Sequence, residues 1–352
     1  MDITPYLKLM VEKNASDVFF TVNSPVRIKI EGRITPIGKT IMTPAHCEAA
    51  ATGIMTDYHR NKFEDNLEVD FAISLPDGSA RFRVNVFRQR GEVSMVLRLI
   101  PSQIPTLEQF GLPDILGEQI LKKRGLILMV GATGSGKSTT QAAMLNHRNE
   151  NMSGHILTIE DPIEFSHPNK KSIINQREIG VDTFSYRNAL RSSLREAPDV
   201  ILIGEIRDRD TMEAALELSN TGHLAVSTLH ANNANQAMER VINLFPQQLH
   251  KQLLMDLSLN IRSVISQRLV TGVDGKLCAA IEILINTPHI ADLILKGDLD
   301  EIKKAMAESG ASGMATFDVA LFNLYKDGRI DLEEALNNAD SRTNLEAKIN
   351  FG

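Results

Sequence analysis

Residues 131–138 read Gly131-Ala132-Thr133-Gly134-Ser135-Gly136-Lys137-Ser138, a complete G-x-x-x-x-G-K-[ST] phosphate-binding loop. The residues before it, 126–130, form a short and wholly apolar run that is typical of a buried parallel strand, and residues 139–146 have the pattern of a helix. A loop that joins such a strand to a helix presents successive backbone N–H groups to phosphate oxygens. The sequence therefore predicts that this loop binds a nucleoside triphosphate.

The motif also predicts what its individual residues do. Lys137 is expected to reach the β- and γ-phosphate oxygens, and the Ser138 hydroxyl is expected to be a ligand of Mg²⁺. A glycine-rich turn without a ligand is the alternative, which strand, motif and helix in register disfavour. The expected nucleotide-binding residues are Thr133, Gly134, Ser135, Gly136, Lys137, Ser138 and Thr139.

Length and composition are those of an ordinary soluble protein. With 352 residues, 43% of them apolar and 23% charged, the chain is long enough for about two domains. The net charge of −6 gives no general attraction to nucleic acid or to anionic lipid. No apolar run reaches the roughly 18 residues of a membrane span, and the N-terminus lacks a signal-peptide pattern, so we expect a cytoplasmic protein that does not insert into a membrane.

The cysteine content limits the kinds of metal site. Cys47 and Cys278 are the two cysteines of the chain. This number fits a reducing compartment, and it excludes a zinc site built only from the cysteines of one chain. Both are expected to be buried fillers.

The first 100 residues predict a small α+β domain with an antiparallel sheet. Apolar residues at helical spacing follow residues 4–5 and 43–44, and alternating residues indicate strands between 16 and 30 and between 68 and 100. Residues 101–112, which contain two prolines, are expected to be a linker.

Two arginines of this domain are candidate functional residues. On the predicted strand 80–88, Arg81 and Arg83 share the face opposite to Phe82 and Val84. Two arginines on a solvated strand face are most often plain soluble surface, and the residues alone favour this interpretation. The alternative is that they reach the nucleotide phosphates as arginine fingers do.

Carboxylates follow two of the apolar runs after the phosphate loop. Residues 155–159 lead to Glu160-Asp161-Pro162-Ile163-Glu164, and residues 199–204 lead to Glu205. The carboxyl ends of parallel strands meet at one edge of an open α/β sheet, where ligands bind. Glu164 or its neighbours would there orient water, and Glu205, in a Walker B role, would bind a water of the Mg²⁺ shell.

A further apolar run, 224–229, lies between His223 and His230. A lone histidine at a strand end is most often structural. His230 shares the predicted edge with the phosphate loop, so a role in sensing the γ-phosphate remains the alternative for it.

The order of these elements predicts a doubly wound parallel sheet over residues 113–286, with a hairpin near its end. Residues 287–352 are predicted to be a helical C-terminal region. No basic stripe with interleaved aromatic residues indicates a DNA-handling motor. The short charge clusters Lys170-Lys171 and Arg207-Asp208-Arg209 are expected to be solvated or at subunit contacts.

Five segments together resemble the secretion-ATPase superfamily, and within it the type IV pilus retraction ATPases of the PilT and PilU kind. The resemblance covers nearly the whole chain, and it implies a PAS-like N-terminal domain, a RecA-like C-terminal domain and a ring hexamer that binds ATP between the two domains of a subunit. The segments are GATGSGKSTT from Gly131, ILTIEDPIEF from Ile156, INQREIGVDT from Ile174, LREAPDVILIGEIRD from Leu194 and NTGHLAVSTLHANNA from Asn220.

The resemblance also implies roles for site residues. It gives Glu164 the catalytic role and Glu205 the Walker B role, and it assigns both histidines that flank residues 224–229 to a His box. It places Arg81 and Arg83 on a strand whose family counterparts reach toward the nucleotide, which reverses the preference stated above. ATP rather than GTP is likewise implied by the family.

Within the family the chain is more similar to the PilU branch than to the PilT branch. Ala132 stands where many PilT proteins have proline, and residues 289–294 lack the arginine of the PilT AIRxLI helix. The resemblance implies an accessory retraction ATPase that works with a PilT-type partner and an inner-membrane pilus platform protein, and so lies at the inner membrane peripherally. The alternative is a nucleotide-binding module that docks on a partner ATPase and has little activity of its own.

Overall fold

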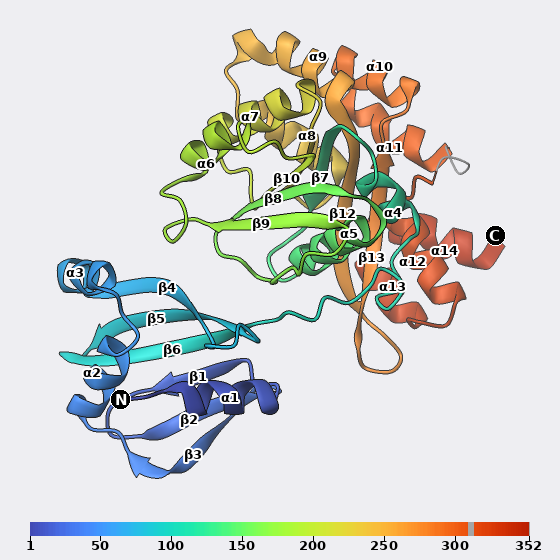
Figure 1. The fold of residues 1–352 in the computed structure, drawn as a ribbon. Helices are drawn as coiled ribbons and strands as arrows, with labels where there is room; N and C mark the ends of the chain where they lie inside the picture. The colour runs from blue at the N-terminus through green and yellow to red at the C-terminus, as the bar shows by residue number, and fades with distance from the viewer. Residues whose placement is uncertain (309–312, 352) are drawn as a thin grey trace. The chain divides into compact units, whose positions relative to one another are not determined.

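The computed structural model describes residues 1–308 and 313–351. These residues form two compact units, which are treated separately here (Figure 1). The N-terminal unit comprises residues 1–103 together with the short segments 163–166 and 180–182, and the other described residues form the C-terminal unit. Within the described chain, no helix has the length and apolar character needed to cross a bilayer.

The N-terminal unit is a six-stranded antiparallel sheet in the order β3-β2-β1-β6-β5-β4, as its alternating residues predict. Its core is apolar, and the buried residues include Phe82 and Val84 of β5. The elements are α1 (Thr4–Glu12), β1 (Asp17–Phe20), β2 (Pro25–Ile30), β3 (Arg33–Ile41), α2 (Pro44–Thr52), α3 (Asp57–Asn66), β4 (Glu68–Ser74), β5 (Arg81–Gln89) and β6 (Glu92–Ile100).

The C-terminal unit contains a seven-stranded sheet in the order β13-β12-β7-β11-β10-β8-β9. All neighbouring pairs are parallel except β12 with β13, so the prediction of a mostly parallel sheet is confirmed. The strands are β7 (Gly125–Val130), β8 (Gly154–Glu160), β9 (Ser172–Glu178), β10 (Val200–Ile203), β11 (Leu224–Leu229), β12 (Ile261–Thr271) and β13 (Leu277–Ile285).

Helices cover both faces of this sheet and continue to the C-terminus (Figure 1). The helices are α4 (Ile115–Ile120), α5 (Lys137–Asn151), α6 (Tyr186–Ser193), α7 (Arg209–Asn220), α8 (Ala234–Asn243), the 3₁₀ helix η1 (Gln247–Leu249), α9 (His250–Asn260), α10 (Pro288–Lys296), α11 (Leu299–Glu308), α12 (Phe317–Lys326), α13 (Leu332–Asn338) and α14 (Arg342–Phe351).

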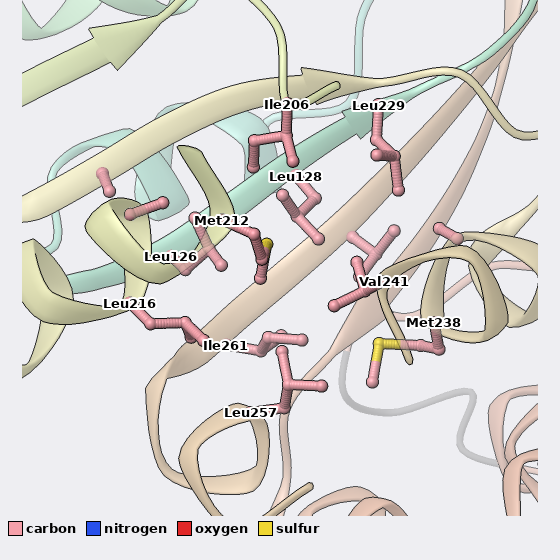
Figure 2. Close-up of a cluster of buried hydrophobic side chains, with 14 of the residues drawn as sticks. Leu126, Leu128, Ile206, Met212, Leu216, Leu229, Met238, Val241, Leu257 and Ile261 are labelled. Atoms are coloured by element: carbon pink, nitrogen blue, oxygen red, sulfur yellow. The ribbon is translucent and has the colours of Figure 1, made fainter. Parts of the chain in front are cut away.

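Strand β7 is buried on both of its faces, which explains why its sequence is apolar without alternation. Leu126 and Leu128 belong to the core beneath α7 and α9, where Met212 and Leu257 also lie (Figure 2). Ile127 and Met129 alternate with them and point the other way, into the core that contains Met144 of α5. The phosphate-loop strand is therefore held firmly from two sides.

The strand registers bring the predicted functional segments to one edge of the sheet. Val130 of β7 pairs with Leu229 of β11, and Ile203 of β10 pairs with Ile159 of β8. Since these strands are parallel, the residues that follow them emerge at the same edge. The phosphate loop, Glu205, His230 and Glu160 are among these residues.

Several elements were not predicted, for identifiable physical reasons. Strand β3 is exposed along nearly its whole length, so it has no apolar alternation. Strand β9 is the edge strand of its sheet, and its second half is polar. Helix α5 extends five residues beyond the predicted end at 146, because tertiary contacts support its polar last turn; Arg148 Nη1 donates to Ile120 O at 2.6 Å.

A buried carboxyl group in strand β13 should make stability depend on pH. Glu282 is only 2% exposed, and its Oε1 accepts hydrogen bonds from the N–H of Ala234 at 2.8 Å and from Ser266 Oγ at 3.1 Å. Burial raises the pKa of Glu282 above its ordinary value of 4.5, and the two hydrogen bonds oppose this only in part. The fold therefore favours the neutral form of Glu282. The contribution of this form to the free energy of unfolding is fully present below pH 4.5 and is lost as the pH rises through the folded-state pKa.

Glu282→Gln keeps the acceptor oxygen and removes the ionisation. We expect its free energy of unfolding to exceed that of the wild type increasingly as the pH rises from 4.5 to the folded-state pKa of Glu282, by about 1.4 kcal/mol for each pH unit in that interval. Urea unfolding at several pH values measures this difference. Glu239→Gln, on the exposed side of α8, is the control. If the free energies of unfolding of Glu282→Gln and the wild type differ by the same amount at every pH, the pKa of Glu282 is not raised by folding.

Candidate functional site

The phosphate loop joins β7 to α5 in a conformation that needs glycine. Gly134 and Gly136 have φ values of 79° and 84°, in the left-handed region. A Cβ at Gly136 would also lie 2.7 Å from Gln267 Nε2, so a side chain there is excluded by its neighbour as well. The start of α5 is fixed to β12 by a buried hydrogen bond of 2.7 Å from Thr140 Oγ1 to Gln267 Oε1.

Inside the loop, two polar side chains are arranged for an anionic ligand. Lys137 is 8% exposed, and its Nζ donates to the carbonyl oxygens of Gly131 at 2.9 Å and Ala132 at 2.8 Å. Ser135 Oγ is buried and has no hydrogen-bond partner within the described chain. A buried hydroxyl without a partner is unfavourable, so a ligand oxygen in the loop would satisfy it. The residues present therefore fit a bound phosphate.

Glu205 follows Gly204, just after the end of β10, and its carboxylate contacts the side chains of Arg207 and His230. Its side chain is 16% exposed. Arg207 Nε donates to Glu205 Oε2 at 2.6 Å, and His230 Nε2 lies 3.2 Å from Glu205 Oε1. The structure thus brings Glu205 and His230 together, and it adds Arg207, which was expected to be solvated or at a subunit contact.

The donor set also suits magnesium shared with a nucleotide. No three His, Cys, Asp or Glu side chains gather into a metal site in residues 1–308 and 313–351. At nucleotide sites Mg²⁺ usually takes phosphate oxygens of the nucleotide and one or two protein oxygens as ligands. The Ser138 hydroxyl at the start of α5 and the Glu205 carboxylate at the same sheet edge are the oxygen donors that fit it.

Two cavities border the phosphate loop. One of about 320 Å³ is lined by Gly131 and Ala132 together with His230 and Arg240. Another of about 360 Å³ is lined by residues 131–135 and also by side chains from β12 and by Asn338 at the end of α13. His230 therefore shares a cavity with the loop, and the C-terminal helices contribute to the wall of the second cavity.

His223 lies at the other end of β11 from the phosphate loop, and its role in the site stays a prediction. It precedes β11, and its carbonyl oxygen accepts from the N–H of Gly125 at the start of β7. Its Nδ1 lies 3.1 Å from Thr221 Oγ1 and 3.2 Å from the Leu218 carbonyl oxygen. Six strand residues, about 20 Å, separate this end from the phosphate loop. These contacts are those of a structural histidine.

The other three predicted catalytic residues belong to the N-terminal unit. Glu164 is exposed and lies in segment 163–166, which is joined to the end of β6 by a hydrogen bond from Ser166 N to Pro101 O at 3.0 Å. Arg81 and Arg83 lie on β5 and are half-buried. Arg83 Nη2 is 3.8 Å from Asp70 Oδ1, and Arg81 Nε is buried without a partner in the described part of the chain.

Tyr186 is a further residue of the C-terminal unit that sequence reasoning missed. It begins α6 and lines a cavity of about 850 Å³ with Asp161, Glu205 and Arg207. A Cβ built on Gly204 would lie 2.6 Å from the Tyr186 hydroxyl oxygen, so the ring packs directly on the backbone before Glu205. Burial, followed by the nearby carboxylate of Asp161, raises the pKa of this tyrosine.

Comparison with known proteins gives consistent relatives. The family described as "Type II/IV secretion system protein" matches residues 1–342. The type IV pilus ATPase PilU of Pseudomonas aeruginosa is 50% identical over 353 aligned residues, which are 100% of this chain and 92% of that protein. The type IV pilus retraction ATPase PilT of the same organism is 42% identical, with 95% of this chain and 97% of that protein covered.

The structural comparison points to the same group. A crystal structure of the pilus retraction motor PilT with bound ADP has a TM-score of 0.90 at 40% identity, and it covers 98% of this chain and 99% of that one. The Legionella pneumophila ATPase DotB has a TM-score of 0.81 at 27% identity, with 94% of each chain covered. The higher identity to PilU than to PilT confirms the branch that residues 132 and 289–294 indicated.

Proposed function

Because the chain belongs to the type II/IV secretion system protein family, in its PilT/PilU group of type IV pilus ATPases, we propose that it is an ATP-hydrolysing subunit of a homohexameric motor that drives or assists type IV pilus retraction. One observation carries the enzymatic part of this proposal. The complete phosphate loop, with buried Lys137 and unpartnered Ser135, lies at the same sheet edge as Glu205 and its neighbour His230.

In the proposed site the C-terminal unit, as a RecA-like domain, binds the nucleotide. Residues 133–139 hold its phosphates, and Ser138 and Glu205 hold Mg²⁺, the latter through water. When bound, Mg²⁺ would neutralise part of the negative charge of the phosphates. ATP rather than GTP is proposed because the PilT relative was crystallised with ADP. His230 would respond to the γ-phosphate through its contact with Glu205.

The N-terminal unit, as a PAS-like domain, is proposed to complete the site. Glu164 orients the attacking water, and Arg81 and Arg83 stabilise the developing phosphate charge. The unpartnered Arg81 Nε supports this, since a buried cationic donor without an acceptor is unfavourable. Conformational change on ATP binding and on phosphate release would convert hydrolysis into movement. His223 has no part in this scheme.

The proposed setting is the cytoplasmic side of the inner membrane, at the pilus machine. A PilT-type ATPase and an inner-membrane platform protein are the proposed partners, and neither nucleic acid nor membrane insertion is involved. Helix α10 supports an accessory role, because its surface carries Asp292 paired with Lys296 at 2.6 Å and no arginine. The second candidate, a nucleotide-binding module that docks on a partner ATPase, rests on the same feature.

ATP hydrolysis by the purified protein, measured over a concentration series with the mass determined by light scattering, tests the proposal. Turnover that rises as hexamers form would support a motor whose sites are completed by assembly. Nucleotide binding without turnover in a folded hexamer would favour the accessory module. A protein that binds no nucleotide at any concentration would contradict both candidates.

A further inference from the structure

The two oxygens of the Glu205 carboxylate face opposite sides of the site. Oε1 lies 3.2 Å from Nε2 of His230, which follows β11, the strand between β10 and the phosphate-loop strand β7. Oε2 accepts a hydrogen bond of 2.6 Å from Nε of Arg207, on the side of the cavity that Asp161 also lines. Asp161 follows β8, on the other side of β10. Oε1 is therefore bound by a residue that follows β11, the neighbour of the phosphate-loop strand, and Oε2 by a residue in the cavity that Asp161 lines.

Arg207 is held on that far side by its hydrogen bond to Glu205, in a cavity that Asp161 also lines. Tyr186 packs its hydroxyl on the backbone of Gly204 and so fixes the chain from which Glu205 extends. The Arg207 side chain is itself 62% exposed, so its removal leaves no large cavity in the core.

We propose that Arg207 is a positioning residue for the Walker B carboxylate: it binds Oε2 so that Oε1 remains directed toward the phosphate loop, where it can accept a hydrogen bond from metal-bound water. A free glutamate side chain has several rotamers, and fixing one of them lowers the entropy lost when the metal and nucleotide bind. A short charge-assisted hydrogen bond is strong enough to select the rotamer. This inference rests on the proposed nucleotide site and adds a residue to it.

Two other interpretations of the same contact predict different results. An exposed ion pair can contribute almost nothing, in which case Arg207 is merely a surface residue. Alternatively, the guanidinium competes with Mg²⁺ for the carboxylate, in which case its removal should strengthen metal binding. The positioning role alone predicts that metal binding weakens and that the effect depends on Glu205.

The test measures how Mg²⁺ tightens the binding of a fluorescent ADP analogue, which requires no hydrolysis. We expect Arg207→Ala to raise the Mg²⁺ concentration for half-maximal tightening about tenfold, with binding in the absence of Mg²⁺ unchanged. Arg207→Lys keeps the charge and should recover part of the effect. Arg209→Ala is the matched control, because Arg209 forms an exposed ion pair of 2.7 Å with Glu213 one helical turn away and should leave the titration unchanged.

The same substitution in a Glu205→Gln background decides whether Arg207 acts through the carboxylate. We expect Arg207→Ala to have no further effect there, since residues that act as a unit are not additive. An Arg207→Ala titration equal to that of Arg209→Ala, a lower Mg²⁺ requirement, or an equal effect in both backgrounds would each overturn the inference. Wild-type protein that binds nucleotide without hydrolysing it still tests the inference, whereas wild-type protein that binds no nucleotide overturns both the inference and the proposed function.

Discussion

Replacement of Lys137 by alanine is expected to lower ATP turnover about 100-fold or more. Its Nζ is already inside the loop, on the carbonyl oxygens of Gly131 and Ala132, and it is the cation available there to meet the β- and γ-phosphates. Initial rates of phosphate release at saturating Mg-ATP measure the effect. Lys251→Ala, on the exposed face of α9, is the control and should keep the wild-type rate.

Loss of the two loop hydrogen bonds could also loosen the loop, so thermal unfolding and analogue binding accompany the rate measurement. A folded Lys137→Ala protein with weakened binding and lost turnover is the expected combination. A variant that hydrolyses ATP at the wild-type rate would show that the activity lies elsewhere in the chain or in a contaminant.

Glu164→Ala should remove turnover while nucleotide binding persists. A residue that orients or deprotonates the attacking water contributes about 100- to 10,000-fold to the rate, and it does not hold the phosphates. Single-turnover hydrolysis and fluorescent-analogue binding separate the two properties. Glu239→Ala, an exposed glutamate on α8, serves as the matched control.

The position of Glu164 in the N-terminal unit makes this prediction specific. If Glu164 acts on the nucleotide, the loss should appear in the chemical step and leave the Mg²⁺ requirement for binding as in the wild type. Hydrolysis at an undiminished rate would instead favour another carboxylate near the end of β8, such as Glu160, its last residue, or Asp161, which follows it.

The sequence was most informative where a local motif and burial agree. The phosphate loop, its apolar strand and the helix after it have strong local patterns, and β7 is buried on both faces as such a run requires. Strands β3 and β9 were missed because they lie at sheet edges, where one row of backbone groups has no partner strand; the side chains of β3 are mostly exposed, and the second half of β9 is polar. Their pairing depends on a neighbouring strand rather than on their own pattern.

The side-chain contacts of Glu205 could not be predicted from the sequence either. The motif gave Glu205 its expected position, but the contact from Arg207 depends on side-chain conformations in the irregular segment between β10 and α7. A charge cluster of alternating sign contains no information about which partner each residue selects. The signal available was the closeness of Arg207 to a Walker B glutamate in sequence. His223 and His230 lie at the two ends of β11, as the sequence predicted, and only His230 contacts Glu205.

The segment 163–166 has a consequence for fragments of the chain. A fragment that ends at residue 103 would lack Glu164 and the hydrogen bond from Ser166 N to Pro101 O, because this segment of the N-terminal unit comes later in the chain, after β8. A separately produced N-terminal unit therefore needs residues 163–166 from a second polypeptide or a redesigned connection.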